Sequence, residues 1–316
     1  MRKIIVALFI ALLALVPAMG AAGGGQPKDL QGHALGLFEI EGVVFTDIDE
    51  QSGRLVVGVT NRGLARSVQA RASALGISLS EMDVVETQPI VFASTLRDGV
   101  RPLEGGLQIA FKVKRATYAC TLGFNAVRSS TGGFVTNSHC TAKQGAVEGT
   151  QHYQPTIATA NLVGTETADA SFATCSRGKK CLDADVAFST RAQGVTASLG
   201  SLARTTGAND GSLTIAGTFA IVGEALGNAP VGTTLNKVGR TTGWTQGTVI
   251  SSNVNVGVQG TNIILLGQDI VAARVGGGDS GSPVFTTPNE SGQVVLSGIL
   301  WGGATDGSYF VYSPIA

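Results

Sequence analysis

The segment Gly278-Asp-Ser-Gly-Ser-Pro283 carries the strongest chemical signal in the sequence. A nucleophilic serine needs an exposed hydroxyl on a sharp turn, and it needs nearby backbone N–H groups that are free to bind an oxyanion. Glycine at 278 and 281 allows the close backbone approach that such a turn requires. An ordinary Gly-Ser turn is the alternative, because the chain is rich in glycine. The segment makes Ser280 the candidate nucleophile.

A serine nucleophile needs a base, and histidine is the most common one. The chain has three histidines. His139 lies in Thr136-Asn-Ser-His-Cys-Thr, directly after the strand-like Gly133-Phe-Val, and Cys140 can tie it to that strand. His33 lies in a leader segment and His152 in a polar loop, and for both we expect a solvated surface position. His139 is therefore the candidate base.

The third group must be a carboxylate that orients the imidazole. The segment Cys181-Leu-Asp-Ala-Asp-Val-Ala-Phe offers Asp183 and Asp185. Asp185 directly precedes the apolar run Val-Ala-Phe, so we expect it to be buried at the start of a strand. Asp183 is expected to face solvent, and it stays open as the alternative.

The chain order His…Asp…Ser, with His139-Cys140 and Gly278-Asp-Ser-Gly, resembles the chymotrypsin family of serine proteases. Two further segments are similar to its bacterial streptogrisin and α-lytic-type branch. They are Cys120-Thr-Leu-Gly-Phe-Asn, which leads into Gly-Phe-Val-Thr-Asn-Ser-His139-Cys, and Val238-Gly-Arg-Thr-Thr-Gly-Trp. The resemblance covers about residues 106–316.

The resemblance implies a fold and a set of roles. The fold is all-β, with two six-stranded antiparallel barrels. Ser280 would attack the peptide carbonyl, His139 would take and return the proton, and Asp185 would hold His139. The N–H groups of Gly278 and Ser280 would form the oxyanion hole. No cofactor and no metal are implied.

The four cysteines are Cys120, Cys140, Cys175 and Cys181. Export would permit disulfides, and an even count allows two bridges with three connectivities. A zinc site is the competing interpretation, but the CxxC pairs of a structural zinc site are absent. The resemblance implies the bridge Cys120–Cys140, with Cys175 and Cys181 as the remaining pair.

Some segments depart from the family pattern. No Arg followed by Ile-Val-Gly-Gly precedes Cys120, so Asp279 is expected to lack a new N-terminal ammonium as its partner. Leu300 stands where many relatives have serine before Trp-Gly. The backbone of Leu300-Trp301-Gly302-Gly303 is still expected to form a wall along which a substrate strand lies.

Arg274 would fall near the floor of the specificity pocket. A buried unpaired arginine is costly, so Arg274 either points to solvent or selects acidic side chains. Relatives continue into a C-terminal helix, so we expect this chain to be truncated at its C-terminus.

Composition limits the function classes. The formal net charge of zero gives no basic field for nucleic acid or an anionic membrane. Arg2 and Lys3, the apolar run 4–16 and Ala18-Met19-Gly20 predict a signal peptide over residues 1–20 and therefore secretion. An uncleaved membrane anchor is the alternative, and no stable membrane association is expected after the signal is removed.

A flexible leader is expected over 21–36, followed by a small α+β domain over 37–102. Strands are predicted at 45–49, 54–60 and 84–92. A helix capped by Asn61 has apolar residues at 64, 68, 72 and 75 and stops at Gly76. After Gly105, short strands alternate with Gly, Asn, Thr and Ser turns, which is typical of sandwiches or barrels. The polar stretch 191–211 is interpreted as a connection between two barrels.

The sequence therefore predicts a secreted serine endopeptidase that acts on protein or peptide substrates. A catalytically silent homologue that binds protein or polysaccharide is the alternative. An α/β-hydrolase esterase is disfavoured, because its Ser…Asp…His order and βαβ pattern are missing. We expect the N-terminal domain to act as a propeptide-like folding aid or inhibitor, and an independent tethered domain is the alternative.

Overall fold

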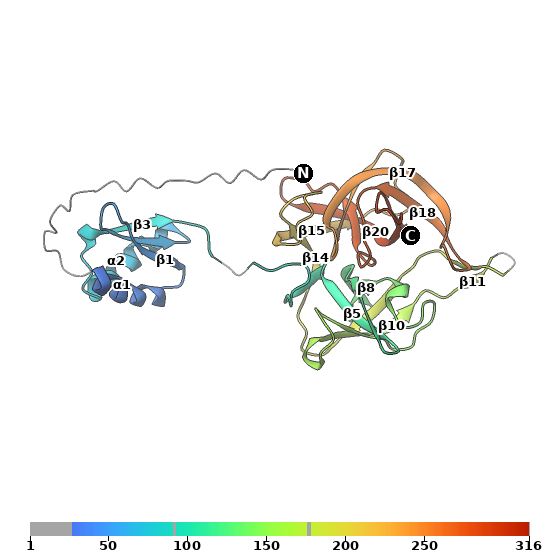
Figure 1. Cartoon of the computed structure of the whole chain (residues 1–316), viewed down its shortest axis with the longest axis horizontal. Coiled ribbons are helices and arrows are strands. Elements are labelled where there is room, and N and C mark those ends of the chain that lie inside the picture. Colours follow the sequence, from blue (N-terminus) through green and yellow to red (C-terminus); the bar gives the residue numbers. More distant parts are fainter. Residues whose placement is uncertain (1–26, 91–92, 176–177, 316) are drawn as a thin grey trace, which may run out of the picture. The chain divides into compact units, whose positions relative to one another are not determined.

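A computed structural model of the chain describes residues 27–90, 93–175 and 178–315 (Figure 1). The chain divides between Phe92 and Ala93 into two compact units. The predicted signal peptide over 1–20 and the first part of the predicted leader lie outside the described residues. Within the described ranges, no helix is both long enough and apolar enough to span a membrane.

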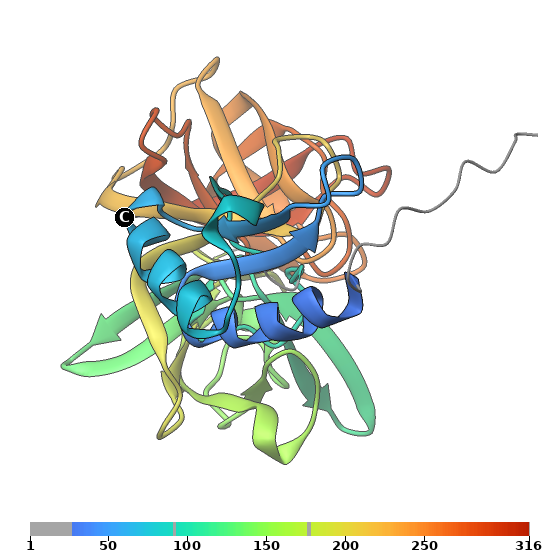
Figure 2. The same ribbon diagram turned by 90° about the vertical axis from the view of Figure 1, so that its left-hand side faces the viewer.

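The first unit is a three-stranded sheet with helices (Figure 2). Strand β2 pairs antiparallel with β1 and parallel with β3. The predicted β-β-α-β order is present, and the Asn61 side chain accepts a hydrogen bond from the Gly63 N–H, 2.7 Å away. The elements are α1 Pro27–Ala34, η1 Leu35–Glu39, β1 Val43–Ile48, β2 Leu55–Val59, η2 Arg62–Leu64, α2 Ala65–Ala74, η3 Leu79–Glu81 and β3 Met82–Glu86.

Part of the predicted flexible leader is helical, which corrects that expectation for residues 27–36. Leu30, Ala34 and Leu37 recur at i, i+4 and i+7, which places them on one helical face. Ala34 and Leu37 are fully buried in the core of the first unit, and Leu30 packs against it. The burial of this face explains why these residues form a helix, although the glycine-rich composition of the leader predicts a flexible segment.

Residues 93–105 belong to the second unit, so the predicted boundary near Pro102 lies too late in the chain. Leu96 and Leu103 are both fully buried in the largest apolar core of the second unit. The Leu96 N–H donates to the Leu213 carbonyl at 2.9 Å, and the Leu103 N–H donates to the Thr196 carbonyl at 2.9 Å. The segment is therefore part of the second unit.

The second unit is all-β (Figure 1). The strands are β4 Leu103–Gly105, β5 Gln108–Val113, β6 Ala116–Thr121, β7 Phe124–Arg128, β8 Thr131–Thr136, β9 Gln151–Tyr153, β10 Leu162–Asp169, β11 Ala173–Thr174, β12 Lys180–Leu182, β13 Ala187–Arg191, β14 Ala197–Thr205, β15 Ile215–Glu224, β16 Thr234–Gly239, β17 Gly243–Gly257, β18 Ile263–Ala272, β19 Pro283–Thr286, β20 Gln293–Gly303 and β21 Phe310–Pro314. Two short 3-10 turns interrupt them, η4 Ser138–Cys140 and η5 Thr159–Asn161.

The first barrel follows the sheet order β6-β5-β9-β10-β13-β8-β7, and all its pairs are antiparallel. Only Leu122 and Gly123 separate β6 from β7, so the two segments act as one bent strand. The Leu122 N–H donates to the carbonyl of Leu107, which directly precedes β5, and the Gly123 N–H donates to the carbonyl of Val135 on β8. The bend closes a ring of six strands.

The second barrel closes without a bend, in the order β18-β17-β16-β19-β20-β21 and back to β18. These six ladders are all antiparallel. The predicted all-β class with two six-stranded antiparallel barrels is therefore confirmed. The predicted connection at 191–211 contains β14, which pairs with β15, and β15 lies parallel to β20.

Candidate active site

His139 lies on η4, the short 3-10 turn that follows β8 of the first barrel. The turn is tied down by buried polar groups. The Asn137 side chain donates to the Asp185 carbonyl at 2.7 Å, and the Thr141 hydroxyl donates to the Ser138 carbonyl at 2.8 Å. The His139 side chain keeps 32% of its surface exposed, so it faces the solvent-accessible cleft from a fixed backbone.

Of the two aspartates left open by the sequence, Asp185 is the one that contacts His139. Its Oδ2 lies 2.5 Å from His139 Nδ1, and its Oδ1 accepts the His139 backbone N–H at 3.0 Å. Gln144, which the sequence did not single out, donates to the same Oδ1 at 3.4 Å. Asp185 is buried, whereas Asp183 is exposed.

This contact controls the charge state of His139. Burial lowers the pKa of His139, but the attraction of the Asp185 carboxylate and its hydrogen bond raise it by more. The pKa therefore lies above the ordinary value of 6.5. Since Nδ1 is bound to Asp185, Nε2 is the ring nitrogen left to exchange a proton at neutral pH.

Ser280 lies on a sharp turn between β18 and β19 that requires glycine on both sides. Gly278 and Gly281 have φ angles of +99° and +90°. A Cβ at Gly281 would lie 2.2 Å from the Thr121 carbonyl oxygen, and one at Gly278 would lie 2.6 Å from an Arg240 nitrogen. The left-handed backbone strains any side chain at both positions, and at Gly281 the contact with backbone excludes one.

The same turn leaves two backbone donors unused. Asp279, Gly281 and Ser282 each donate their N–H to a carbonyl of the protein. Within the part of the chain that the structure describes, the N–H groups of Gly278 and Ser280 have no hydrogen-bond partner. Two backbone N–H groups beside a serine that have no other hydrogen-bond partner can together stabilise a developing oxyanion.

The Ser280 turn packs against the η4 turn that carries His139. The Ser280 carbonyl oxygen accepts the Thr121 N–H at 2.8 Å and lies 3.9 Å from Sγ of Cys140. The Ser280 hydroxyl is directed at the Trp301 carbonyl oxygen, 3.5 Å away. No hydrogen bond joins this hydroxyl to His139 among the described residues.

Asp279 has an ammonium partner that the sequence did not reveal. Lys237 on β16 places Nζ 3.3 Å from Asp279 Oδ2, and both side chains are fully buried. Asp279 also accepts the N–H groups of Thr241 and Gly276 at 2.8 and 3.0 Å. Burial lowers the pKa of Lys237, and Asp279 opposes that shift. An internal lysine therefore neutralises the carboxylate next to Ser280.

Replacement of Lys237 by Met should destabilise the second unit strongly, because it leaves Asp279 charged, buried and unpaired. Loss of one partner of a buried ion pair costs about 3–5 kcal/mol. Urea unfolding followed by tryptophan fluorescence would measure the loss. Lys112→Met, at an exposed lysine, is the matched control and should change the free energy of unfolding by less than about 0.5 kcal/mol. Equal stability of the two variants would contradict the role of the pair.

The cysteines form the two bridges Cys120–Cys140 and Cys175–Cys181. The disulfide interpretation is confirmed. The sulfur atoms of Cys120 and Cys140 and a ring nitrogen of His139 lie within 4.8 Å of one another. The disulfide removes the thiolates that a metal would need, so this group does not form a zinc site.

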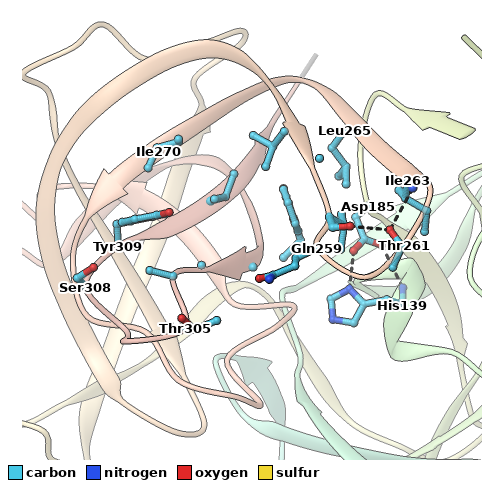
Figure 3. A pocket seen from close by; sticks show the side chains of 18 of the residues that line it. His139, Asp185, Gln259, Thr261, Ile263, Leu265, Ile270, Thr305, Ser308 and Tyr309 are labelled. Carbon is cyan, nitrogen blue, oxygen red and sulfur yellow. Dashed lines mark hydrogen bonds and ion pairs between the residues drawn. The ribbon is translucent and has the colours of Figure 1, made fainter. Parts of the chain in front are cut away.

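Two neighbouring cavities adjoin the candidate residues. The larger, about 920 Å³, is lined by His139, Asp185 and the tip of the β17–β18 hairpin (Figure 3). The smaller, about 260 Å³, is lined by Ser280 and Leu300. Both share the wall formed by residues 302–305 of the chain. We call these two adjoining cavities the cleft: His139 lines the larger one and Ser280 lines the smaller one.

The residues predicted to bind substrate fall into two groups. Leu300 lines the cavity beside Ser280, Trp301 lines the larger cavity, and Gly302 lines both. Arg274 is exposed and lines neither cavity, although its backbone carbonyl accepts the Thr245 hydroxyl at 3.0 Å. Of the two alternatives for Arg274, the structure therefore shows the solvent-facing one.

His152 is fully buried, which corrects its predicted surface position. Its Nε2 donates to the Cys140 carbonyl at 2.9 Å, and its Nδ1 accepts the Ser189 hydroxyl at 2.8 Å. The ring packs against Phe111 and Phe134. Burial lowers the pKa of His152 to about 4, so the ring is neutral at physiological pH.

No protein-family model and no curated protein sequence matches this chain. Solved structures do match it. Protease A of Thermobifida fusca is 24% identical with a TM-score of 0.47, and the match covers 67% of this chain and 90% of that one. A Nocardiopsis protease is 24% identical with a TM-score of 0.45, covering 67% and 91%. An α-lytic protease homologue is 21% identical with a TM-score of 0.47, covering 67% and 92%. This chain is similar to these bacterial serine proteases.

Proposed function

We propose that the chain is a secreted serine endopeptidase that hydrolyses peptide bonds through an acyl-enzyme on Ser280. The observation that carries the proposal is the 2.5 Å contact between His139 Nδ1 and the buried Asp185 carboxylate, in a cavity that shares its wall at residues 302–305 with the cavity that Ser280 lines. His139 would take the Ser280 proton on Nε2 and return it to the leaving amine. No metal and no cofactor take part in this scheme.

The free N–H groups of Gly278 and Ser280 would stabilise the tetrahedral intermediate. Asp185 keeps the pKa of His139 above its ordinary value, which favours the imidazolium that forms when the serine attacks. The enzyme would need neutral His139 at the start of the reaction. Activity would therefore rise with pH through that raised pKa.

A second candidate function is a catalytically silent homologue that binds protein or polysaccharide in the cleft. One observation favours it: the Ser280 hydroxyl is directed at the Trp301 carbonyl and not at His139. Hydrogen bonds of a catalytic serine often tighten only when substrate is bound, so this geometry is compatible with both functions.

A fluorophosphonate probe separates the two functions. It labels only a serine that an adjacent base activates. Labelling that disappears when Ser280 is replaced would support the endopeptidase. Absence of labelling both in the oxidised full-length protein and in residues 93–316, which lack the first unit, would favour the binding module.

The cavity beside Ser280 suggests which side chain would precede the cleaved bond. Its lining is uncharged, and it consists mainly of glycine with Val275, Leu300 and Ala304. A charged side chain would lose its hydration there without gaining an ion-pair partner, and such desolvation costs several kcal/mol. We therefore propose a preference for uncharged, apolar residues.

Peptides with Phe, Leu or Met before the scissile bond should show kcat/KM values at least ~100-fold above those with Lys or Glu. The desolvation of a charge costs several kcal/mol, and each 1.36 kcal/mol corresponds to a factor of ten in rate. Gly302→Val should reduce cleavage after Phe more than after Ala. A Cβ at Gly302 meets no atom within 4 Å, so the variant should fold with a narrower cavity. Gly223→Val, at an equally open glycine of β15, is the control. Equal cleavage after Lys and Phe would contradict the preference.

For the first unit, we propose a role as folding aid or inhibitor of the second. Barrels built from long-range strand pairs fold slowly. A small domain with its own apolar core can fold early. Residues 27–90, added in trans to refolding residues 93–316, would then speed recovery of activity or inhibit the mature enzyme. Identical refolding and activity with and without them would favour an independent tethered domain.

A further inference from the structure

The side chain of Gln268 on β18 is fully buried next to the candidate site, and the proposed mechanism does not use it. Its Nε2 donates to the carbonyls of Asp183 and Leu266 at 2.9 and 2.6 Å. Its Oε1 accepts the Trp301 indole N–H and the Ser313 hydroxyl, both at 2.8 Å. The amide thus uses both donors and both acceptor positions.

The orientation of this amide follows from the chemistry of its neighbours. An indole N–H can only donate, so the oxygen must face Trp301. The two backbone carbonyls can only accept, so the nitrogen must face Asp183 and Leu266. A flipped amide would lose these three bonds inside the protein, where an unsatisfied polar group costs about 1–3 kcal/mol. Gln268 is therefore locked in one orientation.

The segment that carries Asp185 depends on such contacts, because residues 183–186 belong to no strand. The Asp185 N–H donates to the Ser313 hydroxyl at 3.3 Å, and that hydroxyl in turn donates to Gln268. Two residues earlier, the Asp183 carbonyl is bound directly to Gln268. The Asp185 backbone is thus held from the second barrel by Ser313 and Gln268, and from the first by Asn137.

The same amide also fixes the other side of the cleft. Trp301 lines the larger cavity, and its carbonyl oxygen faces the Ser280 hydroxyl. Gln268 holds the Trp301 ring through its indole N–H. One buried side chain therefore bonds to the segment behind His139 and to the strand beside Ser280.

We propose that Gln268 is a positioning residue that sets the Asp185 carboxylate and the Trp301 strand relative to each other. The inference deepens the proposed function, since the reaction it serves is peptide hydrolysis by Ser280, His139 and Asp185. Gln268 touches neither the reacting atoms nor His139; it acts through Ser313, Asp183 and Trp301.

Gln268→Met tests the proposal in the full-length oxidised protein, because Met has a similar length and volume but makes none of the four hydrogen bonds. Displacement of a catalytic group by about 1 Å can cost about 100-fold in rate, so kcat should fall about 10- to 100-fold. As Asp185 moves away, the pKa of His139 should fall. NMR titration of the His139 ring measures this shift without any need for catalysis.

Asp185 is the charged group that shifts the pKa of His139. Asp169 on β10 interacts with the charge of Asp185, and Glu148 acts on Asp169. Neither Asp169 nor Glu148 makes a hydrogen bond with Gln268 within the described ranges.

Asn236→Leu is the matched control, since Asn236 is a fully buried amide of β16 that accepts the Trp244 indole N–H at 2.8 Å. Both variants should lower the free energy of unfolding, but only Gln268→Met should change kcat and the His139 titration. A folded Gln268→Met protein with wild-type kcat and an unchanged His139 pKa would overturn the proposal. So would equal changes in both variants.

If Gln268→Met does not fold, Ser313→Ala takes its place, because it removes only the hydroxyl between Gln268 and the Asp185 N–H. A lower His139 pKa supports the proposal, and an unchanged one overturns it. Wild-type protein that neither hydrolyses peptides nor reacts with a fluorophosphonate, both as the full-length chain and as residues 93–316, would disprove the proposed function. The NMR titration would still decide the role of Gln268 in placing Asp185.

Discussion

Ser280→Ala should abolish hydrolysis of peptides and esters while the fold stays intact. In Ser-His-Asp proteases, loss of the nucleophile alone lowers kcat by roughly 10⁶-fold, and the remainder comes from binding and the oxyanion hole. The substitution removes one hydroxyl whose single hydrogen bond is long, at 3.5 Å, so the stability should change by less than about 1 kcal/mol. Steady-state kinetics with a chromogenic ester and thermal unfolding would measure both.

Ser291→Ala is the control for this experiment. Ser291 is exposed between β19 and β20, and its hydroxyl makes no hydrogen bond within the described residues. Its replacement should leave kcat within twofold. Turnover by Ser280→Ala at more than a few per cent of the wild-type rate would remove Ser280 from the mechanism.

Asp185→Asn should lower kcat by roughly 10⁴-fold, and Asp183→Asn should leave it within twofold. An Asn amide at 185 can present N–H to His139 Nδ1, which favours the wrong imidazole tautomer. The variant would keep the shape of the site and remove the charge that raises the pKa of His139. Measurement of kcat/KM against pH for both variants checks the assignment.

Asp183 provides the matched control, because it is two residues away and its side chain is exposed. Only its backbone carbonyl takes part in the network with Gln268, and a substitution at the side chain leaves that carbonyl in place. If Asp183→Asn is the inactive variant and Asp185→Asn is active, the choice of orienting carboxylate is wrong.

The candidate triad could be predicted from the sequence because each member lies in a short contiguous segment. Glycines around Ser280 and the cysteine after His139 are local features that a single sequence displays. The choice of Asp185 over Asp183 followed from one apolar run, Val-Ala-Phe. The all-β barrel class could also be predicted, because short strands between turns are a local pattern in the sequence.

The supporting residues could not be predicted, because their burial depends on partners far away in the sequence. Lys237 appears as an ordinary polar residue of a strand, yet it is buried against Asp279. Gln268 follows the same pattern, and its partners lie on three other segments. His152 was placed at the surface because its neighbours in the sequence are polar, whereas its partners Ser189 and Cys140 satisfy it inside the barrel.

The burial of Leu96 and Leu103 restricts where a proteolytic cut could separate the first unit without damage to the second. A cut after Pro102 would detach Leu96, and the emptied site would destabilise the rest of the second unit by about 2–5 kcal/mol, comparable to a leucine-to-alanine change in a core. A cut before Ala93 would leave both leucines with the barrels they fill. If the first unit is removed, N-terminal sequencing of the stable product should therefore find a new N-terminus no later than residue 93, the start of the segment that carries both leucines.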